Sequence, residues 1–174
     1  MQPKFTKFHG LGNDYLVIEA NELAEVEDLG AFAKEICNRH YGAGGDGIAI
    51  IGPSETSDAD FKCRIFNPDG SEAGLSGNGT RCAVAYLYYK NLWTNDQLRL
   101  STRTGLKKYF LRGQPAPGKF LFESELGQPK LDPPSIPMNV SASMDQVIGY
   151  PLIVHGETFP VTAIKMGNSL CSIF

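Results

Sequence analysis

Residues 76–92 read SGNGTRCAVAYLYYKNL, and this stretch decides the fold. Its pattern predicts a helix over about residues 79–91 that is apolar on nearly every side, from Cys82 to Leu87. Such a helix has no face suited to water, so it must be surrounded by protein. A strongly curved sheet wrapped around the helix would meet that demand.

The other elements are mostly short strands. Tyr15–Glu19 and Phe61–Asn67 are examples, and in the second of these Phe61, Cys63 and Ile65 alternate with polar residues. Few helical patterns separate these strands, so we expect a mainly antiparallel sheet and an α+β fold class. The expected strands are residues 4–8, 15–19, 47–52, 61–67, 97–101, 107–112, 119–123, 151–154, 159–165 and 171–174. An amphipathic helix over residues 28–38, with Asp28 as its N-cap, should lie on the sheet.

Domain boundaries follow from the prolines. Residues 127–137 (GQPKLDPPSIP) contain four prolines, which cannot donate hydrogen bonds to a sheet, so we expect a connection here. Residues 1–126 then form the first domain. Residues 138–174 are too few to fold alone, and we interpret them as the beginning of a second domain.

Composition excludes several classes of function. The chain has 174 residues, of which 42% are hydrophobic and 20% charged, which is typical of a globular protein. No apolar run approaches the ~20 residues that a membrane span needs. The first ten residues lack the apolar stretch of a signal peptide, so we expect a cytoplasmic protein without a membrane partner. The net charge of −3, without a basic stripe, argues against a nucleic-acid partner.

Cysteine and histidine are scattered along the chain. No C-x-x-C pair occurs, and the three histidines are far apart in sequence, so we expect no metal site. Cys37, Cys63 and Cys82 lie among apolar residues and are predicted to pack in the core as reduced thiols.

The glycine-rich segments are the candidate functional residues. Ser76 to Gly79 lead directly into the apolar helix, where unpaired backbone N–H groups and the helix dipole can bind a carboxylate or phosphate. An ordinary capped turn is the alternative. Asn13 and Asn67 follow turns, where an asparagine either supports the turn or binds carboxylate and ammonium groups.

Five segments together resemble the diaminopimelate epimerase family, a group of cofactor-independent amino-acid isomerases of lysine and cell-wall synthesis. They are KFHGLGNDYLVIE (7–19), NRHYGAGGDG (38–47), RIFNPDGSEAGLSGNGTRC (64–82), RLSTRTG (99–105) and VTAIKMGNSLCSIF (161–174). The resemblance implies two similar domains, each a curved sheet around an apolar helix, with the active site between them. It also implies two cysteines that exchange the substrate's α-proton, and no pyridoxal cofactor.

Carried over by position, the resemblance assigns the substrate-binding residues. Asn13, Asn67 and Asn168 correspond to substrate-binding asparagines, and Gly77 and Asn78 to the backbone cradle of the α-carboxylate. Gly47 stands where some members have a glutamine that contacts the substrate. Here only its backbone could make that contact.

Three departures from the family pattern bear on activity. Ser76 occupies the position of the first catalytic cysteine, and an alcohol without an adjacent base is a poor proton shuttle. Cys82 lies too far along the helix to replace that cysteine. Leu170 stands where the family usually has a histidine, and the segment with the second catalytic cysteine has no match in these 174 residues.

Two principal hypotheses remain open at this stage. In the first, the chain is part of an epimerase that converts LL- to meso-diaminopimelate, and the chain alone is impaired in this activity. Its serine at position 76 is natural or engineered, and its partner is a second copy or a complementing chain. Alternatively, it is a non-catalytic descendant that binds amino-acid carboxylates or acts as an interaction module. A one-base isomerase or lyase, with Ser76 as a proton donor, is a third interpretation.

Overall fold

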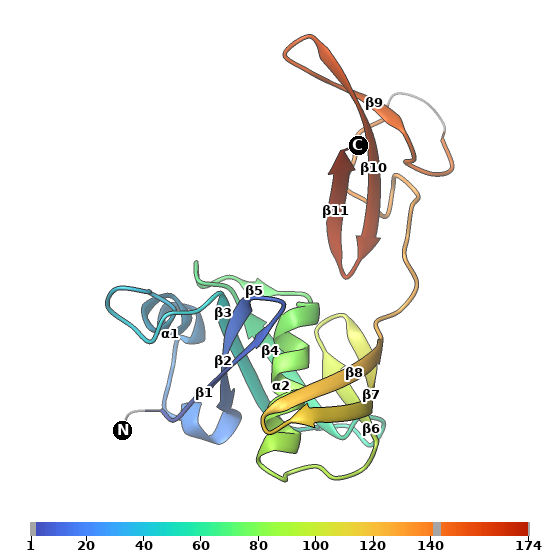
Figure 1. The fold of residues 1–174 in the computed structure, drawn as a ribbon. Coiled ribbons are helices and arrows are strands. Elements are labelled where there is room, and N and C mark those ends of the chain that lie inside the picture. Colours follow the sequence, from blue (N-terminus) through green and yellow to red (C-terminus); the bar gives the residue numbers. More distant parts are fainter. Residues whose placement is uncertain (1–2, 141–143, 174) are drawn as a thin grey trace. The chain divides into compact units, whose positions relative to one another are not determined.

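The computed structural model describes residues 3–140 and 144–173, and the chain divides into two compact units, Met1–Glu125 and Leu126–Phe174. In the first unit the strands follow the order β1-β2-β3-β4-β6-β7-β8, and β5 pairs with β4 (Figure 1). The strands are β1 (Thr6–Gly10), β2 (Asn13–Glu19), β3 (Gly47–Pro53), β4 (Phe61–Phe66), β5 (Glu72–Ala73), β6 (Gln97–Thr102), β7 (Gly105–Ala116) and β8 (Lys119–Glu125). The helices are the 3-10 helix η1 (Ala20–Leu23), α1 (Leu29–Ile36) and α2 (Gly77–Tyr89).

The sheet is mainly antiparallel, with two parallel pairs, β2 with β3 and β4 with β6. Each parallel pair is connected through a helix, α1 in the first case and α2 in the second. A parallel connection has to return the chain to the same end of the sheet, and a helix provides the length for this. The two helices in the sequence therefore explain where the antiparallel order is interrupted.

Helix α2 is the centre of the first unit. It contacts β1 and β8, the two edge strands of the sheet, as well as β2, β3 and β4 between them. A flat sheet could not bring both edges to one helix, so the sheet curves around α2 (Figure 1). The predicted α+β fold class, with a curved sheet around an apolar helix, is confirmed.

Both ends of α2 are capped by local groups. At the start, the side chain of Ser76 accepts a hydrogen bond from the backbone N–H of Gly79. At the end, Asn91 adopts a φ of 54°, and the N–H of Leu92 donates to the carbonyl of Leu87, 2.9 Å away. This left-handed ending is a Schellman motif, which asparagine tolerates. The helix therefore stops at Tyr89, slightly earlier than the sequence pattern indicates.

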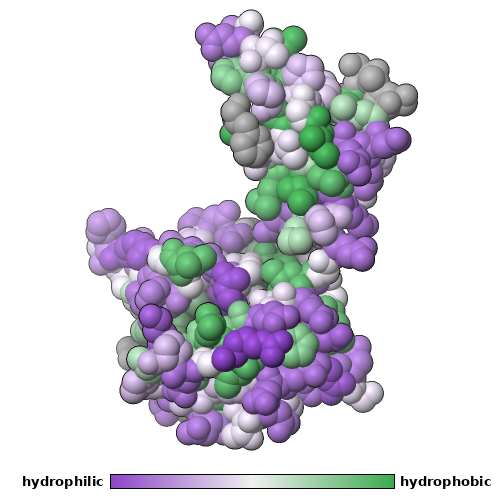
Figure 2. Space-filling view, turned by 45° about the vertical axis from the view of Figure 1, so that its right-hand side comes forward, coloured by the Kyte–Doolittle hydropathy of each residue, from purple (hydrophilic) through white to green (hydrophobic). Residues whose placement is uncertain are grey.

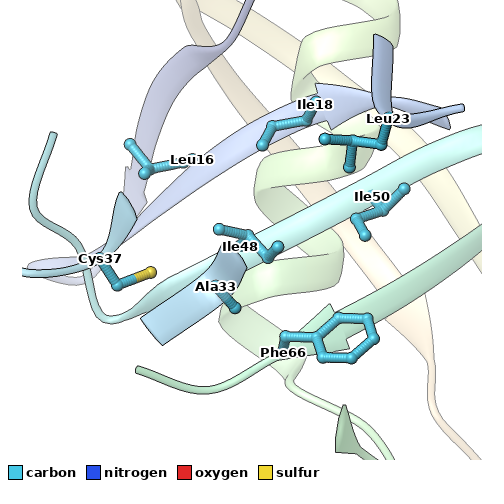
Figure 3. Close-up of a cluster of buried hydrophobic side chains, with 8 residues drawn as sticks. All are labelled: Leu16, Ile18, Leu23, Ala33, Cys37, Ile48, Ile50 and Phe66. Carbon is cyan, nitrogen blue, oxygen red and sulfur yellow. The ribbon is translucent and has the colours of Figure 1, made fainter. Parts of the chain in front are cut away.

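The opposite face of the sheet is covered by α1. Asp28 caps α1 as predicted, with its side chain accepting from the N–H of Ala31. A buried cluster forms between α1, η1 and the strands (Figure 3), consisting of Leu16, Ile18, Leu23, Ala33, Cys37, Ile48, Ile50 and Phe66. The middle strands are therefore buried on both faces. Cys63 and Cys82 are buried as well, so the predicted core placement of Cys37, Cys63 and Cys82 is confirmed.

The second unit is a three-stranded antiparallel sheet in the order β11-β10-β9. Its strands are β9 (Tyr150–Val154), β10 (Glu157–Met166) and β11 (Asn168–Ile173). Ile136, Val147 and Ala163 form its small buried cluster. Ile136 belongs to the proline-rich segment 127–137, so the segment that we expect to be a connection also contributes to a core.

Apolar side chains are exposed on the second unit, as Figure 2 shows. They include Ile153, Leu170 and Ile173. These three side chains lie outside the small buried cluster of Ile136, Val147 and Ala163. Within residues 3–140 and 144–173, no helix is both long and apolar enough to cross a membrane.

A substitution inside α2 tests its central role. Leu87 is 1% exposed, and Leu87→Ala should lower the free energy of unfolding by about 2–5 kcal/mol, because it leaves a cavity that cannot fully collapse. Leu92→Ala is the matched control, since Leu92 is 47% exposed just beyond the helix and should cost less than about 1 kcal/mol. Urea unfolding monitored by circular dichroism measures both. Equal losses would contradict the central position of α2.

Candidate functional site

Strand register brings three of the predicted site residues to one end of the sheet. Tyr15 pairs with Gly47 in the parallel β2–β3 ladder, and Ile48 pairs with Phe66 in the antiparallel β3–β4 ladder. The beginnings of β2 and β3 therefore lie beside the end of β4. Asn13, Gly47 and Asn67 stand at these three positions.

The N-terminal end of α2 joins the same end of the sheet. The hydroxyl of Tyr15, at the beginning of β2, lies 2.9 Å from Ser76 Oγ. Ser76 Oγ also accepts from the N–H of Gly79 at 3.0 Å. The first helical hydrogen bond of α2 runs from Thr80 N–H to the Ser76 carbonyl. The N–H groups of Gly77 and Asn78 precede it, at the positive end of the helix dipole.

Two glycines make room for the Tyr15 ring. A Cβ added at Gly47 would lie 2.7 Å from Tyr15 Cε1, and a Cβ added at Gly79 would lie 2.9 Å from the same atom. Tyr15 is only 4% exposed. In the structure Gly47 is buried under this ring, and its expected backbone contact with substrate stays a prediction.

Asn13 and Asn78 form a chain of amide hydrogen bonds. Asn78 Nδ2 donates to Asn13 Oδ1 at 3.2 Å, and Asn13 Nδ2 donates to Asp46 Oδ2 at 2.8 Å. Arg81 donates to Asn78 Oδ1 at the other end of the chain. A charged group at each end therefore determines which way both amides point.

Arg39 holds the carboxylates beside these amides. It donates to Asp14 at 2.6 Å and to Asp46 at 2.9 Å. Lys7 lies 3.3 Å from the Asp14 carboxylate as well. The hydrogen bonds from Arg39 are the main reason that the pKa of Asp14 lies well below its ordinary value.

Asn67 is engaged in a turn after β4. Its side-chain amide donates to Ser71 Oγ at 3.0 Å, and its backbone N–H donates to the Ser71 carbonyl at 2.9 Å. Asn67 therefore supports the turn, and within residues 3–140 and 144–173 it makes no hydrogen bond to the amides of Asn13 and Asn78. Asn168 lies in the second unit, as the first residue of β11.

No strong base is hydrogen-bonded to Ser76 within the described residues. Its hydroxyl contacts the Tyr15 hydroxyl and the Gly79 N–H. Burial raises the pKa of Tyr15, so the phenol keeps its proton at neutral pH. Burial also raises the pKa of Cys82 to about 11, so Cys82 does not supply a thiolate in its place.

Sequence reasoning missed Tyr15, Arg39, Asp46 and Arg81 as parts of the site. Arg39 and Asp46 lie inside the glycine-rich stretch 39–47, where charged residues between glycines were a usable signal. Tyr15 begins an apolar strand, so the sequence pattern indicates an ordinary core residue. Only its contact with Ser76 in the structure identifies it as part of the site. In the described part of the chain, no three histidine, cysteine or acidic side chains gather where they could hold a metal ion.

The model of the diaminopimelate epimerase family matches residues 5–128. The chain belongs to the diaminopimelate epimerase family. It is 39% identical over 171 residues to a diaminopimelate epimerase of Pelotomaculum thermopropionicum, covering 98% of this chain and 59% of the relative. The diaminopimelate epimerase of Halothermothrix orenii is 35% identical over 174 residues, with 100% and 61% covered. The chain thus spans about 60% of the length of these relatives.

Two solved structures of other proteins share the fold. A hydroxyproline epimerase from Agrobacterium vitis matches with a TM-score of 0.68 at 13% identity, covering 96% of this chain and 50% of that one. A PhzF-family phenazine biosynthesis protein from Bacillus anthracis matches with a TM-score of 0.60 at 21% identity, covering 98% and 53%. At these identities the similarity concerns the fold alone.

The packing of Tyr15 on Gly47 gives a first test. Gly47→Ala should lower the free energy of unfolding by about 1–3 kcal/mol, because the added methyl group overlaps the Tyr15 ring and the Phe66 carbonyl oxygen. Gly113→Ala is the control, because no atom lies within 4 Å of a Cβ added there. It should change stability by less than about 0.5 kcal/mol. A neutral Gly47→Ala in urea unfolding would contradict the close packing.

The lowered pKa of Asp14 gives a test by pH. A carboxyl group whose pKa is lower in the folded state stabilises the protein above its unfolded pKa of about 3.9, and this contribution is lost as the pH falls toward the folded value. Asp14→Asn should therefore destabilise the protein at pH 5–7, and the difference from wild type should shrink below about pH 4. Asp58→Asn, at an exposed position, is the charge-matched control. A difference that stays constant on acidification would contradict the role of Arg39.

Proposed function

We propose that this chain binds the α-carboxylate of a diaminopimelate-like amino acid at the N-terminal end of α2. The backbone N–H groups of Gly77 and Asn78 hold the carboxylate, and the amide of Asn13 contributes polar contacts. Asn67, Gly47 and Asn168 remain candidate substrate-binding residues on the strength of the family resemblance. Family membership also underlies the proposed setting, which is lysine and cell-wall synthesis in the cytoplasm.

One observation carries the proposal. The first turn of α2 presents N–H groups without helical acceptors, beside side chains whose polar atoms are already oriented by Asp46 and Arg81. An N-terminal helix end of this kind favours an anion such as a carboxylate. The oriented amides limit which neighbouring groups of the ligand fit.

We propose further that this chain binds without exchanging the α-proton. Epimerisation without a cofactor needs an acid–base group whose pKa lies near ambient pH. Ser76 is an alcohol, and the groups bonded to its hydroxyl are a protonated phenol and a backbone N–H. Neither can remove its proton.

The second candidate function is a binding or interaction module that has lost catalysis altogether. The buried state of Cys82 and the absence of a base on Ser76 among the described residues favour this candidate as much as an impaired enzyme. The two candidates differ in what a cysteine at position 76 would do. An epimerase site would regain proton exchange, whereas a module that has lost the rest of the site would not.

Nuclear magnetic resonance in D2O tests the proposal. LL-Diaminopimelate mixed with the 174-residue chain should show broadened lines, with the α-proton signal unchanged in intensity over time. The Ser76 hydroxyl stands beside the N–H groups of Gly77 and Asn78 and can donate one hydrogen bond to the carboxylate, so Ser76→Ala should weaken binding about three- to tenfold. Ser57→Ala, at an exposed position, should leave binding unchanged.

Each outcome separates the alternatives. Loss of the α-proton signal with the wild-type chain would show that proton abstraction occurs. It would overturn the proposal that the chain binds without exchanging the α-proton. Unbroadened lines would contradict amino-acid binding. Loss of the α-proton signal with Ser76→Cys would favour the impaired epimerase over the non-catalytic module.

A further inference from the structure

We propose that Tyr15 is a positioning residue for the side chain at position 76. Its phenol donates a hydrogen bond to Ser76 Oγ, so the Ser76 hydroxyl is held as a hydrogen-bond donor toward a bound ligand and cannot accept a proton from it. The identity of that ligand rests on the proposed function. The Tyr15–Ser76 arrangement itself does not.

The Ser76 hydroxyl can take part in a limited number of hydrogen bonds. A hydroxyl oxygen has two acceptor positions and one proton. The N–H of Gly79 occupies one acceptor position at 3.0 Å. The hydroxyl of Tyr15, at 2.9 Å, is then either a donor to the second acceptor position or an acceptor of the serine proton.

Burial of Tyr15 decides between these two directions. Tyr15 is 4% exposed, and Ser76 is the side-chain partner of its hydroxyl in the described structure. If Ser76 donated to Tyr15, the phenolic proton would be left without an acceptor in a buried place, which is costly. Burial raises the pKa of Tyr15, so that proton is present at neutral pH. Tyr15 is therefore the donor.

The position of the phenol is rigidly determined. Its ring fills the space above Gly47 and Gly79, where even a methyl group would come within 3 Å of it. The backbone of β3 at Gly47 and of the first turn of α2 at Gly79 therefore blocks movement of the ring toward either element. Both acceptor positions of Ser76 Oγ are thus occupied by fixed donors, and its own proton points in the remaining direction.

The same geometry makes a prediction for a thiol at this position. A phenolic donor and a backbone N–H would both stabilise a negative sulfur atom, and hydrogen bonds to the charged form lower a thiol pKa below its ordinary value of about 8.5. Removing the phenolic hydroxyl should withdraw part of that stabilisation. The effect is independent of any ligand.

The experiment compares three variants of the 174-residue chain: Ser76→Cys, Ser76→Cys/Tyr15→Phe and Ser76→Cys/Tyr109→Phe. Iodoacetamide alkylation at position 76 is followed against pH by peptide mass spectrometry, and alkylation of the exposed Cys171 corrects for reagent loss. Tyr109→Phe is the matched control. It also removes a buried tyrosine hydroxyl bonded to α2, through Thr80 Oγ1 at 2.6 Å. Thr80 Oγ1 donates to the backbone carbonyl of residue 76 and not to its side chain, so this control leaves the donors to the position 76 side chain in place.

The expected result is a higher apparent pKa at position 76 in the Tyr15→Phe double variant, by about one pH unit, which is about a tenfold lower alkylation rate at pH 7. The Tyr109→Phe double variant should match Ser76→Cys alone. Equal profiles for all three, or equal changes in both double variants, would overturn the proposal. Melting temperatures verify that each variant is folded.

A binding cycle examines the serine itself. Tyr15→Phe should weaken diaminopimelate binding about threefold or more in the wild-type background and have no effect in the Ser76→Ala background, because the phenol acts through Ser76. Equal losses in both backgrounds would overturn the positioning role. If alkylation responds to Tyr15 but diaminopimelate does not bind at all, the proposed function fails and the Tyr15–Ser76 arrangement stands.

Discussion

Helix α2 carries apolar side chains around almost its whole circumference, and the sheet of the first unit bends until both of its edge strands contact that helix. The hydrophobic effect favours this arrangement, because each face of the helix left in water would lose the free energy of burial. The curvature of the sheet follows from enclosing α2, whereas the two parallel pairs follow from the connections through α1 and α2. The site follows too, since the start of a central helix must emerge at one end of the sheet.

Tyr15 connects the packing of the core with the chemistry of the site. Its ring is a core side chain that needs Gly47 and Gly79 as neighbours, while its hydroxyl reaches Ser76 at the N-terminal end of α2. The packing of the Tyr15 ring in the core therefore fixes the position of the hydroxyl that contacts Ser76. The pair of amides beside it is oriented differently, by Asp46 and Arg81 at its two ends.

Membership in the diaminopimelate epimerase family favours an epimerase activity, whereas the serine at position 76 argues against proton exchange. The chain retains a helix start suited to a carboxylate, with oriented amides around it. A serine held by two donors can orient a ligand but is a poor acid–base group near neutral pH. Under the proposed function, carboxylate binding depends on the helix end, whereas proton exchange would also need an acid–base side chain at position 76.

The sequence by itself determined the family and most of the elements, but not the short strand β5 or the 3-10 helix η1. The apolar pattern of the helix predicted over residues 79–91, the strand alternation around Cys63 and the Asp28 cap are local signals, and they predict structure because they depend on residues close in sequence. Asn13, Ser76 and Asn78 were recognisable because glycine-rich turns mark them. Only the tertiary structure decided that Tyr15 contacts Ser76 and that Asp46 orients Asn13. These pairs are 61 and 33 residues apart, and the register of β2 and β3 and the curvature of the sheet bring them together.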